Sequence, residues 1–167
     1  MPLQLVELAG EPRDMGRQFG EELRDGVRAL SEERLRLAMA HAARSGRRLT
    51  REECLALAGQ FVSPHRTYAP EVWAELEGIA EGAAIPLELL LIGNGYTDYR
   101  DVLRRVAGEE ECSSFLIHPD AADGKPLCGQ TWDMHATAEP YAVVVRRRPR
   151  KGPPTLSLTT AGCLSLV

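Results

Sequence analysis

Apolar residues follow two different spacings along the chain, and the change lies near residue 108. Before this point they recur every three or four positions, which is the period of a helix face. After it they alternate with polar residues, as in strands. We therefore expect a helical segment over residues 1–111 and a β-rich segment over residues 112–167. The run at residues 3–8 also alternates, so it predicts a short strand ahead of the helices.

The first helix is expected to run from Pro12 to about residue 43. Proline is suited to a first helical turn, and Gly46 is placed to cap the end. Gly16 and Gly20 lie one turn apart beside the apolar face, where they would let another backbone approach closely. The apolar face itself is formed by Met15, Phe19, Leu23, Val27 and Leu30.

Three further helices are expected to follow. Thr50 and Glu53 have the spacing of a capping box, so the second helix begins at residue 51, and Pro64 ends it. Pro70 and Pro86 begin the third and fourth helices. The residues expected on the inner faces of these two helices are Val72, Trp73, Leu76, Ile79, Ala80, Leu87, Leu90 and Leu91.

The remaining segments predict a linker and four strands. A helical tail is expected as far as Arg105, and the polar run at residues 108–111 is interpreted as an exposed linker. Asp123 and Gly124 form a hairpin signal between the first two strands. The strands are expected at residues 112–118, 125–133, 141–148 and 155–167.

Composition and charge argue against several classes of protein. The chain carries 20 basic and 24 acidic residues, a net charge of −4 that does not suit a nucleic-acid-binding domain. No apolar stretch approaches the roughly 18 residues of a membrane span, and the N-terminus lacks the features of a secretory signal. The four cysteines have no metal-ligand spacing. We expect reduced thiols, no metal or other cofactor, and a cytoplasmic protein that binds neither nucleic acid nor membrane.

The end of the chain is apolar, with Leu164, Leu166 and Val167 among its last four residues. Domain termini are usually exposed and polar, and no helix is expected to cover a second face of the strands. We therefore expect the sequence to be a fragment whose partner is a C-terminal half of the same protein.

The hairpin brings candidate chemistry together. If its turn is centred between residues 122 and 124, Cys112 pairs with a residue between 132 and 135. A thiol then lies within one or two residues of Asp133 and His135. Either His135 takes the proton of the thiol, or cleavage before Cys112 frees an α-amino group that does so while Asp133 holds the ammonium. The alternative is a buried, inert cysteine.

Two motifs around this cysteine resemble a known family. Glu111-Cys112-Ser113-Ser114-Phe115, followed by Gly129-Gln130-Thr131-Trp132-Asp133, is similar to the acyl-coenzyme A:6-aminopenicillanic acid acyltransferase family of N-terminal-nucleophile hydrolases. The segments GEPRDMGRQFGEEL, ELEGIAEG, residues 89–99 and LTTAG resemble further family motifs in the same order. The resemblance therefore extends over nearly the whole chain.

The resemblance implies a fold and a set of roles. The fold would be an α+β structure, an αββα sandwich that is incomplete here. The proenzyme would cut itself between Glu111 and Cys112, and Cys112 would attack an acyl carbonyl to form a thioester. Asp133 would lie near the new amine, with possible support from Ser113, Trp132 and His135. The substrates would be a small-molecule acyl donor, such as an acyl-coenzyme A, and an amine acceptor or water.

Three positions depart from the family pattern. Glu111 replaces a glycine that would ease the turn needed for self-cleavage, Thr131 stands where asparagine is common, and Tyr96 where some members have arginine. The family's oxyanion-hole residues lie in the C-terminal half.

Two other functions remain open. One is an amidohydrolase of N-acyl amino acids or bile salts that uses the same nucleophile. The other is a non-catalytic α+β module that binds a partner through its acidic helices. The basic run at residues 146–151 is suited to phosphates, but its prolines favour a solvated turn.

Overall fold

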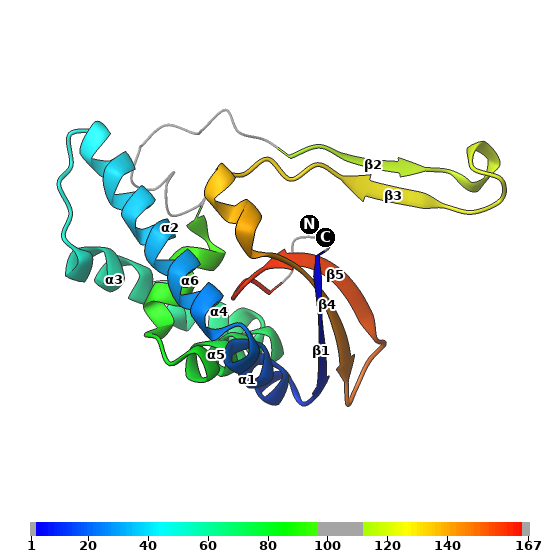
Figure 1. Cartoon of the computed structure of the whole chain (residues 1–167), viewed down its shortest axis with the longest axis horizontal. Coiled ribbons are helices and arrows are strands. Elements are labelled where there is room, and N and C mark those ends of the chain that lie inside the picture. The colour runs from blue at the N-terminus through cyan, green and yellow to red at the C-terminus, as the bar shows by residue number, and fades with distance from the viewer. Residues whose placement is uncertain (1–2, 97–111, 165–167) are drawn as a thin grey trace.

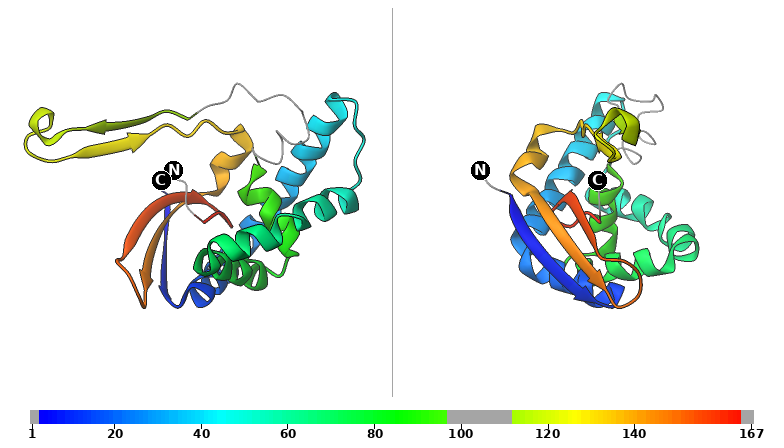
Figure 2. Two further views of the ribbon diagram at one scale, coloured as in Figure 1. Left: turned by 180° about the vertical axis from the view of Figure 1, so that it is seen from behind. Right: turned by 90° about the vertical axis from the view of Figure 1, so that its right-hand side faces the viewer.

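A three-stranded sheet joins the two ends of the chain in the computed structural model, which describes residues 3–96 and 112–164. β1 (Gln4–Gly10) pairs in parallel with β4 (Ala142–Pro149), and β4 pairs antiparallel with β5 (Thr155–Thr160). The helices lie on one side of this sheet (Figures 1 and 2). The protein is thus a mixed α+β structure, and the predicted strand near the N-terminus is confirmed.

The two faces of the sheet differ in burial. Val6 and Leu8 of β1 and Val145 of β4 point into a core that includes Phe19 and Ile79 of the helices. The opposite face carries exposed apolar residues, among them Leu3, Leu5 and Leu156. The alternation in β1 therefore buries one face against the helices and leaves the other face open among the described residues.

Six α-helices are present in the described part of the chain: α1 (Pro12–Glu22), α2 (Arg24–Arg44), α3 (Arg51–Gly59), α4 (Val62–Tyr68), α5 (Pro70–Ala83) and α6 (Leu87–Asn94). The long first helix expected from the sequence is interrupted at Leu23, whose backbone is not helical (φ −108°, ψ 26°). The prediction for Pro64 is also wrong. It lies in the first turn of α4, where proline is tolerated, rather than ending the preceding helix.

Other helix boundaries agree with the sequence. The Thr50 hydroxyl accepts a hydrogen bond from Glu53 N (3.2 Å), and the Glu53 carboxylate accepts one from Thr50 N (2.8 Å), so the capping box is confirmed. Pro70 begins α5, Pro86 directly precedes α6, and Gly46 follows α2 with φ +78°. Val72, expected on an inner face, is half exposed, whereas the buried residues of α6 are Leu89, Leu90 and Ile92. The predicted helical tail and linker lie outside the described residues.

Helices α1 and α5 cross with their backbones in contact. A Cβ atom at Gly16 would overlap the Glu75 carbonyl oxygen and lie 2.9 Å from its carbonyl carbon. A Cβ at Gly20 would lie 2.7 Å from Ala83 N, and one at Gly78 of α5 would lie 2.8 Å from Arg17 N. The predicted close approach at Gly16 and Gly20 is therefore confirmed, and glycines of α5 make it reciprocal.

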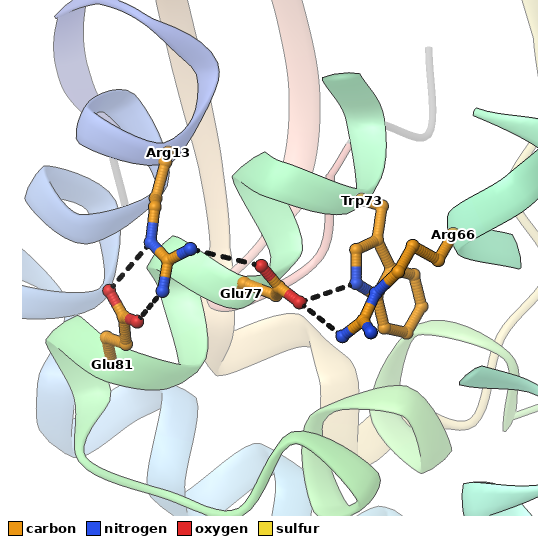
Figure 3. Close-up of polar contacts among 5 residues, drawn as sticks. All are labelled: Arg13, Arg66, Trp73, Glu77 and Glu81. Atoms are coloured by element: carbon orange, nitrogen blue, oxygen red, sulfur yellow. Dashed lines mark hydrogen bonds and ion pairs between the residues drawn. The ribbon is translucent and has the colours of Figure 1, made fainter. Parts of the chain in front are cut away.

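Charged side chains fasten the same pair of helices at the surface (Figure 3). Arg13 of α1 binds Glu81 and also Glu77 (3.2 Å). Glu77 in turn accepts bonds from Trp73 Nε1 and from Arg66, each at 2.7 Å. Partial burial alone would raise the pKa of Glu77, but the bonds from Trp73 and Arg66 outweigh it and lower the pKa.

The first three arginines of the basic run, at residues 146–148, lie in β4, whereas Arg150 and Lys151 lie in the exposed turn that follows it. Arg147 is buried, and its Nε donates to the buried Glu75 of α5 at 2.7 Å. It also donates to Ser157 (3.0 Å) and to the carbonyl oxygen of Leu164. Arg146 points outward and binds Glu7 of β1 (2.6 Å). The expectation of a solvated turn is therefore wrong for Arg147, because β4 alternates its arginines between the two faces of the strand, and it agrees with the structure for residues 150–151.

A separate hairpin projects from the body of the protein (Figure 1). It consists of β2 (Ser114–Ile117) and β3 (Leu127–Gln130), which pair antiparallel. Between them lie the short helix η1 (Pro119–Ala121) and a turn in which Asp123 and Gly124 have φ angles of +50° and +80°. The predicted Asp-Gly turn is confirmed. Helix η2 (Ala136–Tyr141) then leads into β4.

Candidate functional site at the base of the hairpin

The register of the hairpin decides which residues lie opposite Cys112. Ser114 pairs with Gln130, and the pairing continues one residue further. Ser113 N donates to the Thr131 hydroxyl at 3.0 Å, and Thr131 N donates to the Ser113 carbonyl oxygen at 2.8 Å. The next position places Cys112 opposite Trp132. This lies within the range of 132–135 that the turn predicted.

The carboxylate of Asp133 is linked to this end of the hairpin by a hydrogen bond. The Thr131 hydroxyl accepts its bond from Ser113 N and donates to Asp133 Oδ2 at 3.5 Å. Cys112 and Asp133 are both exposed, and Trp132 between them is half-buried. The base of the hairpin therefore carries an exposed thiol on one strand and an exposed carboxylate just beyond the end of the other.

Thr131 has a structural role that the sequence did not reveal. Its hydroxyl is the bridge between the strand that carries Cys112 and the turn that carries Asp133. The sequence marked it only as a departure from the asparagine of the related family. The sequence could have indicated this role, because Thr131 directly follows β3 and lies across from Ser113. At such positions a side chain can contact the neighbouring strand of the hairpin.

His135 has a different local role. Its Nδ1 lies 3.0 Å from the Thr137 hydroxyl and accepts from Thr137 N at 3.4 Å, so the ring caps the start of η2. No hydrogen bond joins it to Cys112 among the residues that the structure describes. The printed hydrogen bonds of His135 are thus made within its own turn, and none of them brings the ring to the thiol as a base.

The other residues predicted to support the nucleophile make few contacts in the described structure. Ser113 contributes its backbone to the pairing with Thr131. Glu111, on the other side of the proposed cleavage site, lies outside the described residues. Trp73, by contrast, is buried in the core as expected for a residue on a helix face.

The four cysteines are free thiols in different environments. Cys54 is buried, and burial raises the pKa of the Cys163 thiol. Cys112 and Cys128 are both exposed, and Cys128 lies opposite Leu116 within the hairpin. Since only an accessible thiolate reacts readily, these two are the candidates for covalent chemistry, and Cys112 is the one that lies at the base of the hairpin.

Over residues 3–96 and 112–164, no group of three or more histidine, cysteine or acidic side chains is arranged to hold a metal ion. Within the same ranges, no helix has both the length and the apolar character needed to cross a bilayer.

Comparison with known proteins leaves the resemblance at the level of motifs. No protein-family model matches the chain, and no curated protein matches it significantly.

Proposed function

We propose that the protein is an acyl-transferring or amide-cleaving enzyme whose nucleophile is Cys112, freed as an N-terminal residue by cleavage of the Glu111–Cys112 bond. The observation that supports this most directly is the exposed thiol at the base of the hairpin, in a register that continues to Trp132, with the Asp133 carboxylate 3.5 Å from the Thr131 hydroxyl on the facing strand. The motifs at residues 111–115 and 129–133 support the same assignment.

The proposed chemistry uses the residue's own amine. A free α-amino group has an ordinary pKa of about 7.7–8.0, so it can accept the thiol proton at neutral pH. The thiolate then attacks the acyl carbonyl and forms a thioester, while the leaving amine or thiol departs with the proton. An acceptor amine or water next attacks the thioester carbonyl and gives up a proton to the α-amino group, while the Cys112 thiolate leaves. The α-ammonium group then returns the proton to the thiolate and regenerates the thiol.

Asp133 is proposed to stabilise the ammonium form of that amine. A carboxylate close to an ammonium favours its charged state, and Thr131 holds the carboxylate in place. Donors to the developing oxyanion are expected from the C-terminal half that the resemblance implies. The four free thiols favour a reducing compartment such as the cytoplasm.

The acceptor separates the two enzymatic versions of the proposal. An acyltransferase passes the acyl group from a thioester such as an acyl-coenzyme A to an amine. An amidohydrolase acting on N-acyl amino acids or bile-salt-like amides passes it to water. Both use Cys112 in the same way, so product analysis with and without an added amine distinguishes them.

Alkylation tests the nucleophile within a single hairpin. In the full-length protein, iodoacetamide should modify Cys112 faster than Cys128 by about tenfold or more, because the freed α-amino group can take up the proton of the Cys112 thiol. Cys128 is the matched control, since it is an exposed cysteine of the same hairpin. Cys112→Ala should abolish acyl transfer, and Cys128→Ala should leave it unchanged. Equal alkylation rates, or full activity in Cys112→Ala, would rule the proposal out.

A non-catalytic binding module is the rival, and one observation favours it. The hairpin exposes Phe115, Leu116 and Leu127 to the extent of 55%, 80% and 51%. Exposed apolar surface of this kind often marks a contact with another chain. A module of this sort would show a slow, unselective reaction of both cysteines and no thioester turnover.

A further inference from the structure

The hairpin leaves the outer edge of β2 without a neighbouring strand in the described part of the chain. Thr131 N donates to the carbonyl oxygen of Ser113, and hydrogen-bonded positions alternate along an antiparallel pair. The backbone groups of Ser113 and Phe115 therefore face β3, whereas those of Ser114 and Leu116 face away from it. The outer edge of β2 thus presents N–H and carbonyl groups that a further strand could bind.

The two edges of the hairpin differ in their protection against another chain. Strands at the edge of a sheet usually carry a charge or a proline that discourages pairing with a second molecule. Lys125 and Pro126 lie directly before β3, but residues 113–117 contain neither a charge nor a proline. Phe115 and Leu116 are 55% and 80% exposed. The edge of β2 is therefore the one suited to an added strand.

The sequence of β2 is complementary to itself in the antiparallel direction. A twofold axis at Leu116 places this residue opposite Leu116 of the partner subunit, so that their outward N–H and carbonyl groups face one another. Phe115 then lies opposite Ile117 of the partner subunit, which is an aromatic and β-branched pair of the kind that stabilises sheets. An axis at Phe115 would instead pair Leu116 with Ser114 of the partner subunit. The apolar side chains therefore favour the axis at Leu116.

The position of the hairpin leaves space for this pairing. The hairpin projects from the body of the protein, with its tip far from the helices (Figures 1 and 2). Because the two β2 strands would run antiparallel, the bodies of the two copies would lie at opposite ends of the joint sheet. A hairpin of two strands is at best marginally stable in water, whereas a sheet of three or more strands can be stable. Pairing would therefore stabilise both hairpins.

We propose that β2 pairs with β2 of a second copy of this chain, so that two hairpins form one four-stranded antiparallel sheet around a twofold axis at Leu116. The order of strands is β3–β2–β2–β3, and the tip of each hairpin lies beside the base of the other. The proposal does not rest on the chemistry of Cys112. A strand from another part of the same protein is the competing occupant of this edge, and it would leave the protein monomeric.

Sedimentation equilibrium of the protein tests the association. The average mass should rise towards twice that of one chain between about 1 µM and about 100 µM. Leu116→Lys sets two like charges opposite each other at the axis and should weaken association by about tenfold or more. Leu127→Lys makes the same change at an exposed leucine of β3 and should weaken it less than about twofold. A monomer at every concentration, or equal losses in the two variants, would overturn the proposal.

Disulfide cross-linking tests the register independently of these variants. Phe115→Cys and Ile117→Cys are each made in a chain that also carries Cys112→Ala and Cys128→Ala, and the two proteins are mixed and oxidised. Opposite positions of a non-hydrogen-bonded pair have Cα atoms about 4.5 Å apart, which a disulfide can bridge. The mixture should therefore yield several times more linked dimer than either protein alone. Equal linkage in the mixture and in the separate proteins would refute the register and the proposal with it.

Discussion

Replacing Gly16 by alanine tests whether the close crossing of α1 and α5 holds the helical layer together. The added Cβ would overlap the Glu75 carbonyl oxygen, and it would lie 2.9 Å from the Glu75 carbonyl carbon and 3.0 Å from Ile79 N. All three obstacles are backbone atoms of α5, so no side-chain rotation relieves them. The helices must move apart, and the contacts made by Gly20, Gly78 and Gly82 weaken with them.

Two opposing effects determine the size of the change. Overpacking a tight core costs about 1–3 kcal/mol, and the upper end applies where the obstacle is rigid backbone. Alanine favours a helix over glycine by about 1 kcal/mol. The net loss in the free energy of unfolding is therefore about 2 kcal/mol, which lowers the Tm by about 4–8 °C for a chain of this size.

The assay is urea unfolding followed by circular dichroism, with Gly59→Ala as the matched control. Gly59 is also helical, but a Cβ there meets nothing closer than Glu88 Cγ at 3.8 Å. This control should be unchanged or stabilised by up to about 1 kcal/mol. A Gly16→Ala variant as stable as Gly59→Ala would show that the crossing is looser than the structure indicates.

Three further predictions follow from individual contacts. In the same urea unfolding assay, Arg147→Ala should lower the free energy of unfolding by about 3–5 kcal/mol, because it leaves Glu75 buried without its partner. The control Arg148→Ala, at an exposed residue, should lower it by at most about 1 kcal/mol. The pKa of Glu77 is lower in the folded than in the unfolded protein, so its contribution to the free energy of unfolding is present above the unfolded pKa of about 4.3 and is lost as the pH falls through the folded pKa. Glu77→Gln should therefore flatten this part of a curve of Tm against pH. Asp133→Asn should slow turnover by about tenfold or more while changing Tm little, since the side chain is exposed; a large loss of Tm with unchanged kinetics would make its role structural.

Local signals in the sequence predicted much of the fold. The capping box at Thr50, the prolines before α5 and α6, and the Asp-Gly turn each act within a few residues, so they can be recognised without tertiary information. The break at Leu23 could not be recognised in this way. The apolar period continues through it, although a new helix begins there and packs mainly against α6.

Long-range partners were the part that the sequence concealed. The parallel pairing of β1 with β4 joins segments at opposite ends of the chain, which no spacing rule predicts. The buried ion pair of Arg147 and Glu75 depends on that pairing and on the position of α5. A run of arginines therefore read as solvated, although the strand turns one of them into the core.

The candidate site shows the same division. The hairpin register follows from the turn, so the sequence already placed Cys112 near Trp132 and Asp133. The bridge through Thr131 and the capping role of His135 depend on side-chain directions, which only the three-dimensional arrangement reveals.

The intact mass of the full-length protein after purification tests the central claim most directly. If Cys112 is a self-released nucleophile, the protein yields two chains, and the second begins with Cys112. The Cys112→Ala variant then yields one uncut chain. A single chain in the unmodified protein, or a cut variant without the thiol, would contradict the account.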